Sequence, residues 1–531
     1  MARRQGGPIQ IELGGGFSTD LGTAYAKGPG GDGTLVVPFL TAAENLRFNL
    51  TGWFWKIGGS TRLNATAITE TAVAQTVQGF TDYWKQGTAS SESQDRVAVA
   101  GTKYLKEDVD GVWDDIATGK ESGKHPAFEV FKDDLIISTT SNTDVPVVWD
   151  QATLANLGGT PPNFAFSRAH KNRLFAAGVA TNPSRLYFSE HLNHEDWVGA
   201  GAGSIDIDPD DGDRITGIAS TRYGLFIFKG PHKLSIHVLK GSSPTGDDPF
   251  TREPFKTGVG AVGHNSIIPV STPLAGEDLA FLSPIGVHSL AATEKFGDFA
   301  EAFLSAPIQT YYTEQLNLST LGTVWGVNYA EARALVWAVS AAGVSAKTKY
   351  LVYFYGFTPG RWAIWTGYVP AHSLAILEAS TRKRLYAGMT TGFVEQLDTA
   401  TRTTAAGGSY LGRATTPFLA FGSLGSLKSI GQGYLGLVPK GTQTLDVSVT
   451  YDSGATTTEA IDQSGNGSLW DTMLWDTDNW AGSNRIVKPV PFAGEFREAA
   501  LEFRQGTTAG DMEPQALELH IVPGATSEET L

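Results

Sequence analysis

Short apolar segments recur along the middle of the chain, starting near residue 46. Each is followed by a polar or glycine-bearing turn and a second apolar segment, so each pair predicts a β-hairpin. The first segments of these pairs are 53–55, 97–100, 135–137, 174–177, 225–228, 279–282, 335–339 and 385–387. Their starts lie roughly 40 to 55 residues apart, which is typical of the blades of a β-propeller.

A single hairpin cannot bury both of its faces, so a row of hairpins must stack. The stack can be a closed ring of radial blades or a series of sandwiches. Eight evenly spaced pairs favour the ring, with stacked sandwiches as the alternative. The spacing leaves the blade number open between six and seven.

The pattern changes near residue 401. Threonine- and glycine-rich sequence leads into segments with alternating apolar and polar positions, such as 445–451 and 516–522. Such alternation predicts an antiparallel sandwich with one face of each sheet buried. We therefore expect an all-β chain with an extended N-terminal arm (1–45), a β-propeller-like domain (46–400) and a β-sandwich domain with a short acidic tail (401–531).

Composition agrees with this interpretation and excludes several classes of protein. The chain has 62 glycines and only 18% charged residues, as expected for many short strands joined by turns. It has no cysteine, which excludes disulfides and thiolate metal sites. No uncharged apolar run approaches the roughly 20 residues that span a bilayer. The net charge of −15 argues against a protein that grips nucleic acid by neutralising phosphates, but not against one that lets nucleic acid pass.

The densest group of carboxylates lies in the segment 204–213. It contains Asp206, Asp208, Asp210, Asp211 and Asp213. Alternating aspartates could bind calcium, but the glycine and the closing glutamate of an EF-hand loop are missing at the required positions. We expect an exposed acidic loop between strands, with calcium binding as the alternative.

Other chemistry-bearing groups are sparse. His191 and His194 could bind a metal ion, but they follow a strand and lack a third histidine, so a solvated loop is favoured. A sialidase-like hydrolase would need an arginine cluster, a tyrosine nucleophile and an acidic partner, usually with repeated aspartate-containing turns, and that repeat is missing. No nucleophile elbow or phosphate-binding loop occurs. The sequence predicts no catalytic residues, no cofactor and no metal site.

Three tryptophans, Trp470, Trp475 and Trp480, are spaced five residues apart. This spacing fits neither a strand face nor a helix face. They either anchor a long loop on the sandwich or contact a neighbouring subunit, where tryptophan is enriched.

Several of the hairpin segments resemble a known family. The segments 173–178, 185–189, 212–218, 224–229, 260–263 and 278–287, with the tryptophan-aspartate repeat near 470, resemble the tail nozzle (tail hub) proteins of short-tailed bacteriophages. The likeness covers about residues 90 to 500. The likeness consists of short sequence segments within the blades and includes no catalytic signature.

The resemblance implies a structural virion protein. It implies a ring of identical chains, usually a homo-hexamer, in the viral tail, assembled in the cytoplasm of the bacterial host. Its expected partners are the phage adaptor or head-to-tail connector, tail fibre or needle proteins, and genomic double-stranded DNA, which the channel retains and then releases during ejection. An acidic channel wall repels DNA, and the 204–213 loop is the candidate for that wall.

Two other functions stay open. The chain has 13 tryptophans and 16 tyrosines, side chains that commonly stack on sugars, which motivates a receptor- or carbohydrate-binding tail protein. The third candidate is a propeller-type glycan hydrolase.

Overall fold

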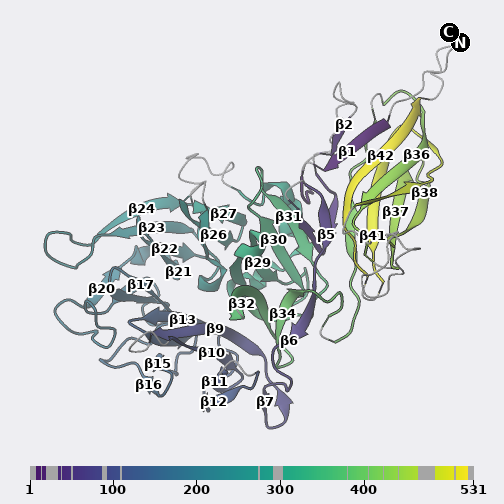
Figure 1. The fold of residues 1–531 in the computed structure, drawn as a ribbon. Helices are drawn as coiled ribbons and strands as arrows, with labels where there is room; N and C mark the ends of the chain where they lie inside the picture. The colour runs from purple at the N-terminus through teal and green to yellow at the C-terminus, as the bar shows by residue number, and fades with distance from the viewer. Residues whose placement is uncertain are drawn as a thin grey trace, which may run out of the picture.

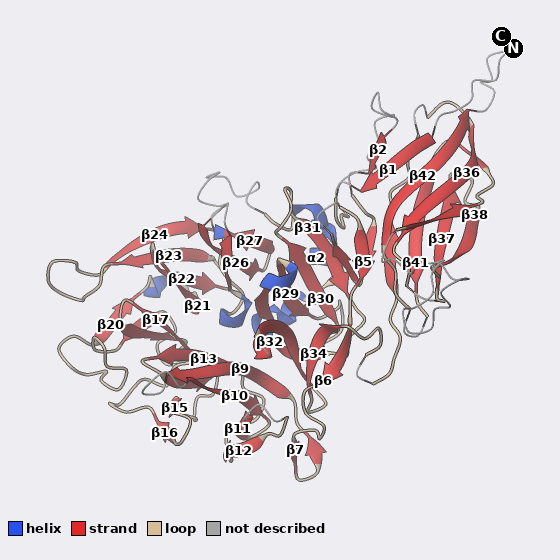
Figure 2. Cartoon of the chain, viewed as in Figure 1, coloured by secondary structure: helices blue, strands red, loops and turns tan. Residues whose placement is uncertain are grey.

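The protein is a β-propeller joined to a β-sandwich (Figure 1). The computed structural model describes residues 8–13, 15–19, 34–37, 39–49, 52–86, 92–107, 111–272, 276–290, 303–379, 381–404, 406–421, 424–440, 442–464, 485–507 and 510–523. Strands dominate both parts, and the few helices are short (Figure 2). Among these residues, no helix is long and apolar enough to cross a membrane.

The described strands form a propeller of seven blades. The first four are four-stranded antiparallel sheets whose strands follow the order of the chain. Blade 1 contains β9 (Val77–Gln86), β10 (Glu92–Ala100), β11 (Lys103–Glu107) and β12 (Asp114–Ala117). Blade 2 contains β13 (Pro126–Phe131), β14 (Asp134–Thr139), β15 (Val147–Trp149) and β16 (Leu154–Asn156). Blade 3 contains β17 (Phe166–His170), β18 (Arg173–Ala177), β19 (Arg185–Phe188) and β20 (Gly203–Asp206).

The remaining blades complete the ring. Blade 4 contains β21 (Arg214–Thr221), β22 (Gly224–Gly230), β23 (Ser235–Lys240) and β24 (Thr251–Thr257), and blade 5 contains β25 (Ile268–Thr272), β26 (Gly276–Ser283) and β27 (Gly286–Ser289). Blade 6 contains β28 (Trp325–Tyr329), β29 (Ala334–Val339), β30 (Lys349–Phe354) and β31 (Arg361–Trp365). The first strands of most neighbouring blades pack side by side, including β32 of blade 7 against β9 of blade 1, so these strands line the axis.

Blade 7 is closed by a strand from the other end of the propeller sequence. It contains β32 (Ala371–Ala379), β33 (Arg382–Met389), β34 (Val394–Thr399) and, as its outermost strand, β6 (Gly59–Arg62). Pairing runs from Glu395 opposite Arg62 to Thr399 opposite Gly59. The ring is therefore fastened by backbone hydrogen bonds between segments far apart in the sequence.

Seven of the eight predicted hairpin segments fall on the second strands of the seven blades: β10, β14, β18, β22, β26, β29 and β33. The predicted segments within these strands are apolar and buried on both faces, and in β29 the whole strand is buried. The eighth, 53–55, overlaps β5 (Phe54–Lys56), which among the described strands pairs with β4 (Leu46–Phe48) alone and belongs to no blade. A further small hairpin joins β7 (Thr69–Glu70) to β8 (Val73–Ala74).

Two sheets pack face to face in the sandwich. The first contains β1 (Pro8–Leu13), β2 (Thr34–Val37), β36 (Lys428–Leu437), β39 (Ile486–Val490), β40 (Glu495–Phe496) and β42 (Pro514–Pro523). The second contains β3 (Ala42–Glu44), β35 (Gly412–Thr415), β37 (Thr444–Tyr451), β38 (Thr456–Asp462) and β41 (Ala499–Gln505). Alternate residues such as Val447 and Val449 are buried in the same apolar core as Leu517 and Leu519.

The N-terminal segment 1–45 differs from the extended arm that the sequence predicts. In β1, Ile9 and Ile11 are buried while Gln10 and Glu12 are exposed, and the strand pairs antiparallel with β42. This alternation gives the segment an apolar face, and the sandwich core covers it. Within 1–45, the segments β1, β2 and β3 are therefore strands of the fold.

One sheet runs through both parts of the molecule. β3 pairs antiparallel with β35 of the sandwich and parallel with β31 of blade 6, producing a nine-stranded sheet. The backbone N–H of Asn45 donates to the carbonyl of Ile364 at 2.9 Å, and the Asn45 side-chain oxygen accepts from the backbone N–H of Thr366 at 2.7 Å. Blade 6 and the sandwich are thus joined by hydrogen bonds as well as by chain connections.

Candidate functional site

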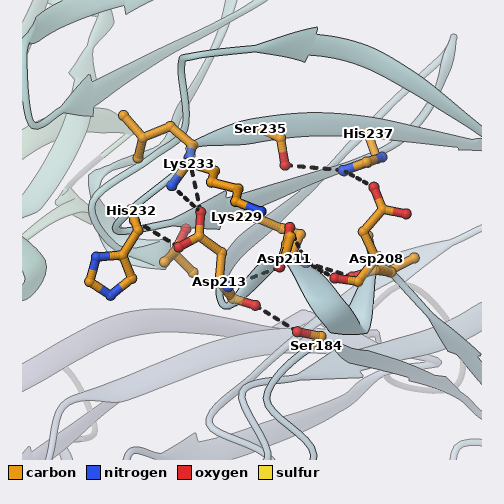
Figure 3. A network of polar contacts seen from close by, with 12 residues as sticks. Ser184, Asp208, Asp211, Asp213, Lys229, His232, Lys233, Ser235 and His237 are labelled. Atoms are coloured by element: carbon orange, nitrogen blue, oxygen red, sulfur yellow. Dashed lines mark hydrogen bonds and ion pairs between the residues drawn. The ribbon is translucent and has the colours of Figure 1, made fainter.

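The predicted acidic loop connects the outermost strand of blade 3 to the innermost strand of blade 4. It leaves β20 at Asp206, forms the short 3-10 helix η1 (Pro209–Asp211) and enters β21 at Arg214. The loop lies close to the strand pair β22–β23, and its aspartates face a set of basic and amide groups from that pair (Figure 3).

Asp211 holds a buried lysine. The Lys229 ammonium on β22 donates to Asp211 Oδ2 at 2.7 Å and to the carbonyls of Ile207 and Asp208 at 2.6 and 2.8 Å. Lys229 is fully buried. Burying an ammonium is costly unless it is paired and hydrogen-bonded, and this loop meets both requirements.

Asp213 accepts hydrogen bonds from three consecutive backbone amides. Its Oδ1 accepts from His232 N at 2.7 Å, and its Oδ2 accepts from Lys233 N at 2.8 Å and Leu234 N at 2.9 Å. The residue is 2% exposed. It fixes the turn between β22 and β23 against the start of blade 4.

Two more aspartates are paired with arginines nearer the surface. Asp206 forms a two-pronged ion pair with Arg185 at 2.6 and 2.9 Å, and this hydrogen bonding lowers the pKa of Asp206. Asp208 pairs with Arg252, which lowers the pKa of Asp208, and lies 3.6 Å from His237 Nε2. In the part of the chain that the structure describes, Asp210 alone among the five has no hydrogen-bond or ionic partner.

The acidic segment is therefore a brace between blades 3 and 4, with most of its charge compensated. The sequence located the carboxylates but gave no sign of their partners, which come from residues 185 and 229–252. Within the described ranges, no group of three or more His, Asp or Glu side chains is arranged to hold a metal ion. The assignment of this loop to a channel wall stays a prediction, with Asp210 as its uncompensated charge.

The other candidate site residues predicted from the sequence either form no common site or lie outside the described residues. His191 is exposed, whereas His194 is buried, 3.7 Å from Asp134 and packed on Phe131. The two histidines therefore have different surroundings and form no common site. Trp470, Trp475 and Trp480 lie outside the described residues.

A second concave site, which the sequence did not indicate, opens at one end of the propeller axis. We refer to this cavity of about 600 Å³ as the axial mouth. Its walls come from the starts of the innermost strands and adjoining loops of blades 2 to 6. They include His125, Asn142, Phe166, Arg214, His264 and Thr323.

His264 forms part of the wall in a fixed orientation. Its ring stacks on Phe166 at 4.7 Å between centroids, and Arg168 Nη2 lies 3.4 Å from its Nε2. Burial, with the nearby Arg168 charge, lowers the pKa of His264 well below its usual value, so the ring is neutral at pH 7. Arg168 is itself paired with Glu129 at 2.6 Å.

A buried lysine supports the wall from behind. The Lys347 ammonium donates to the carbonyls of Thr323 and His372, and burial lowers the pKa of Lys347 to about 7. His372 stacks face to face on His125 at 5.2 Å. Burial, with the Lys347 charge, lowers the pKa of His125 to about 4 and that of His372 to about 3.

Sequence reasoning missed the axial mouth because it recognised the second strand of each blade and not the first. Most first strands carry polar residues among apolar ones, as in the segment 166–170. The axial mouth could have been located from chain position alone, because in a propeller the residues just before each innermost strand meet at one end of the ring.

Comparisons with known proteins add little to this picture. No protein-family profile and no curated protein matches the chain. Among solved structures, YCF48 bound to D1 peptide matches 67% of this chain and 98% of its own, with 12% identity and a TM-score of 0.39. Exo-β-1,3-galactanase from Phanerochaete chrysosporium, solved with β-1,3-galactotriose, matches 88% of this chain and 99% of its own, with 11% identity and a TM-score of 0.27. Likenesses this weak do not bear on the function of the chain.

Proposed function

We propose that the chain is a structural subunit of a bacteriophage tail nozzle, a ring that retains and then releases genomic DNA. The segments that resemble nozzle proteins include β18 and β19 of blade 3, β22 of blade 4 and β26 of blade 5. They are therefore framework strands of three consecutive blades. Similarity in framework strands reflects a shared architecture, not shared catalytic residues.

The observation that carries the proposal is the sheet shared by blade 6 and the sandwich. A two-part protein joined only by a linker can bend between its parts, whereas here β3 hydrogen-bonds to both. The apolar core on this sheet is continuous from Trp337 and Trp362 of blade 6 to Leu501 of the sandwich. Such a body suits the wall of a conduit, which must keep its shape while DNA moves past it.

Charge supports the same role. The net charge of −15 gives a ring of identical copies a large negative potential, and duplex DNA carries about one negative charge per 1.7 Å. Repulsion keeps the DNA from adhering to the wall. Compensation of four aspartates in the 204–213 loop means that this charge must come largely from other surfaces.

The lining of the axial mouth favours a non-catalytic role for that cavity. Glycan hydrolysis needs two carboxyl groups facing the substrate, roughly 5 to 9.5 Å apart. No aspartate or glutamate is among the described residues that line the axial mouth. The buried acids elsewhere are held by structural partners, as Glu395 is by Ser60 at 2.8 Å.

A specific observation keeps carbohydrate binding as the second candidate. Trp84 is 39% exposed and borders a hollow of about 460 Å³ with Asp82 and Glu378. An exposed indole beside carboxylates is a common means of binding a sugar ring. In this alternative, blades 1 and 7 would recognise a receptor glycan.

Imaging of the particle that contains this chain tests the proposal. We expect a closed ring, six copies being the expected number, with a continuous axial channel below the head. A trimer projecting from the side of the tail would contradict the nozzle and support the receptor-binding alternative. Incubating the purified protein with host surface polysaccharide tests the hydrolase, because any cleavage would contradict a purely structural role.

A further inference from the structure

The axial mouth has the opposite charge character to the rest of the chain. The chain has 55 acidic and 40 basic residues, but the described lining of this cavity contains Arg214, two histidines and two asparagines and no carboxylate. A cavity that merely followed the composition would include acidic side chains. This contrast requires a physical explanation.

Arg214 is the free cation of the cavity. Its side chain is exposed at the start of β21, and its guanidinium makes no hydrogen bond or ion pair with any other residue that the structure describes. The neighbouring arginines are all engaged, Arg168 with Glu129 and Arg185 with Asp206. Arg214 thus presents five N–H donors to the cavity with no internal acceptor.

A second group that carries a positive charge when protonated, Lys347, lies directly behind the wall. Lys347 is 4% exposed, and among the described residues its ammonium contacts two carbonyl oxygens and no carboxylate. One of these carbonyls belongs to Thr323, which lines the cavity. Since the interior has a low dielectric constant, an anion in the cavity would interact favourably with the protonated form of Lys347.

The rest of the wall is suited to a compact apolar group. Phe166 presents an aromatic ring fixed by its stack on His264, and Val179 and Val262 lie nearby on the lining. A cavity of about 600 Å³ is within the range of small-molecule sites, roughly 300 to 1,000 Å³. Asn142 adds a side-chain amide to the same lining, whereas the Asn265 amide nitrogen donates to the carbonyl of Pro126 at 3.0 Å.

We infer that the axial mouth is a binding site for a small organic anion, with a carboxylate or phosphate group on Arg214 and an apolar body against Phe166. This site is independent of the proposed nozzle function, because it lies on the axis of one propeller and needs no second chain. Carboxylate and phosphate share the chemistry that a guanidinium binds, and the experiment separates them.

The test uses the full-length chain and isothermal titration calorimetry with three probes: benzoate, phenyl phosphate and uncharged benzamide. We expect saturable binding of at least one of the two anions with one site per chain, and binding of benzamide at least about tenfold weaker. The stronger anion identifies the preferred head group. Absence of saturation with both anions, or equal binding of benzamide, would overturn the inference.

Two variants locate the site. Arg214→Gln removes the free cation, and Asn142→Asp places a carboxylate in the lining; both positions are exposed, so the fold should survive. Each should weaken binding of the preferred anion at least about tenfold, the size expected for a charge-assisted contact. Arg222→Gln is the matched control, because Arg222 is an exposed arginine at the opposite end of β21. Unchanged affinity in both cavity variants, or an equal loss in the control, would place the anion elsewhere.

Discussion

At the scale of single residues, the acidic segment shows how far sequence patterns inform a site. Five aspartates within eight residues are easy to find, and their exposure is a natural expectation. Asp213 is nevertheless buried, because three amides of the β22–β23 turn converge on its carboxylate. Those amides carry no side-chain signature and lie about 20 residues further along the chain, so sequence alone could not pair them.

Asp213→Ala should strongly destabilise the protein. It leaves the buried amide of Leu234 and its neighbours without an acceptor, and hydrogen bonds to a charged group are each worth roughly 1.5–3 kcal/mol. We expect a loss of about 3 kcal/mol in the free energy of unfolding, measured by denaturant titration. Asp210→Ala is the control, since Asp210 is exposed, and should change stability by less than about 0.5 kcal/mol. Equal effects of the two substitutions would contradict the bracing role of Asp213.

Lys347 should make stability depend on alkaline pH in a defined direction. Burial lowers the pKa of Lys347 from 10.5 to about 7, so between these values the unfolded chain binds more protons than the folded one. Stability from this residue therefore rises as pH increases through that window and is constant below it. Relative to Lys347→Met, the wild-type protein should gain thermal stability between about pH 7 and about pH 9.

The control for this titration is Lys383→Met, at an exposed lysine of β33. Its difference in melting temperature from the wild type should not vary with pH over the same range. A pH-independent difference for Lys347→Met as well would show that the ammonium is not the titrating group.

At the scale of elements, the sequence predicted the strands whose central residues are buried on both faces of the sheet. The second strand of every blade contains a short apolar run that is buried on both faces, such as Leu225–Phe228 within β22. The first strands face the axis with polar residues, and the outer strands are short and partly exposed, so both escaped detection. The hairpin β4–β5 was counted with the blades because an apolar pair looks the same whether or not it joins a ring.

The strand β6 was unpredictable for a different reason. Gly59–Arg62 is a polar, glycine-containing segment whose strand character comes wholly from pairing with β34. Gly59 is needed there because a Cβ at this position would lie 1.9 Å from the carbonyl oxygen of Thr403. No local pattern encodes a partner more than 300 residues away.

Gly59→Ala should loosen the closure of the ring. The backbone of β6 would have to move away from the 401–403 segment, and overpacking of this kind costs about 2 kcal/mol. We expect faster amide hydrogen exchange in β34 and a lower melting temperature. Gly431→Ala is the control, since its Cβ would meet only ordinary contacts at 3.6 Å or more. Equal protection of β34 in both variants would contradict a closing role for β6.

At the scale of the whole molecule, the fold class was accessible from the sequence and the connection between its parts was not. Regular spacing of apolar pairs specified the propeller, and the change to strict alternation specified the sandwich. The linear order of residues nevertheless conceals that β1, β2 and β3 complete the sandwich while β6 completes the propeller. Both parts recruit strands from the first 62 residues, so the N-terminal segment is the element that unites them.

Because β6 closes the ring, it must wait during synthesis until its partner strand β34 has been made. A ribosome adds about 5–20 residues per second, so roughly 20 to 70 s pass between the emergence of Gly59 and that of Thr399 in β34. β1 waits still longer for its partner β42. Throughout that interval these strands have unpaired edges, which in other chains invite aggregation. The polar composition of Gly59–Arg62 is then an advantage, since a segment that is strand-like only beside its partner stays soluble until blade 7 exists.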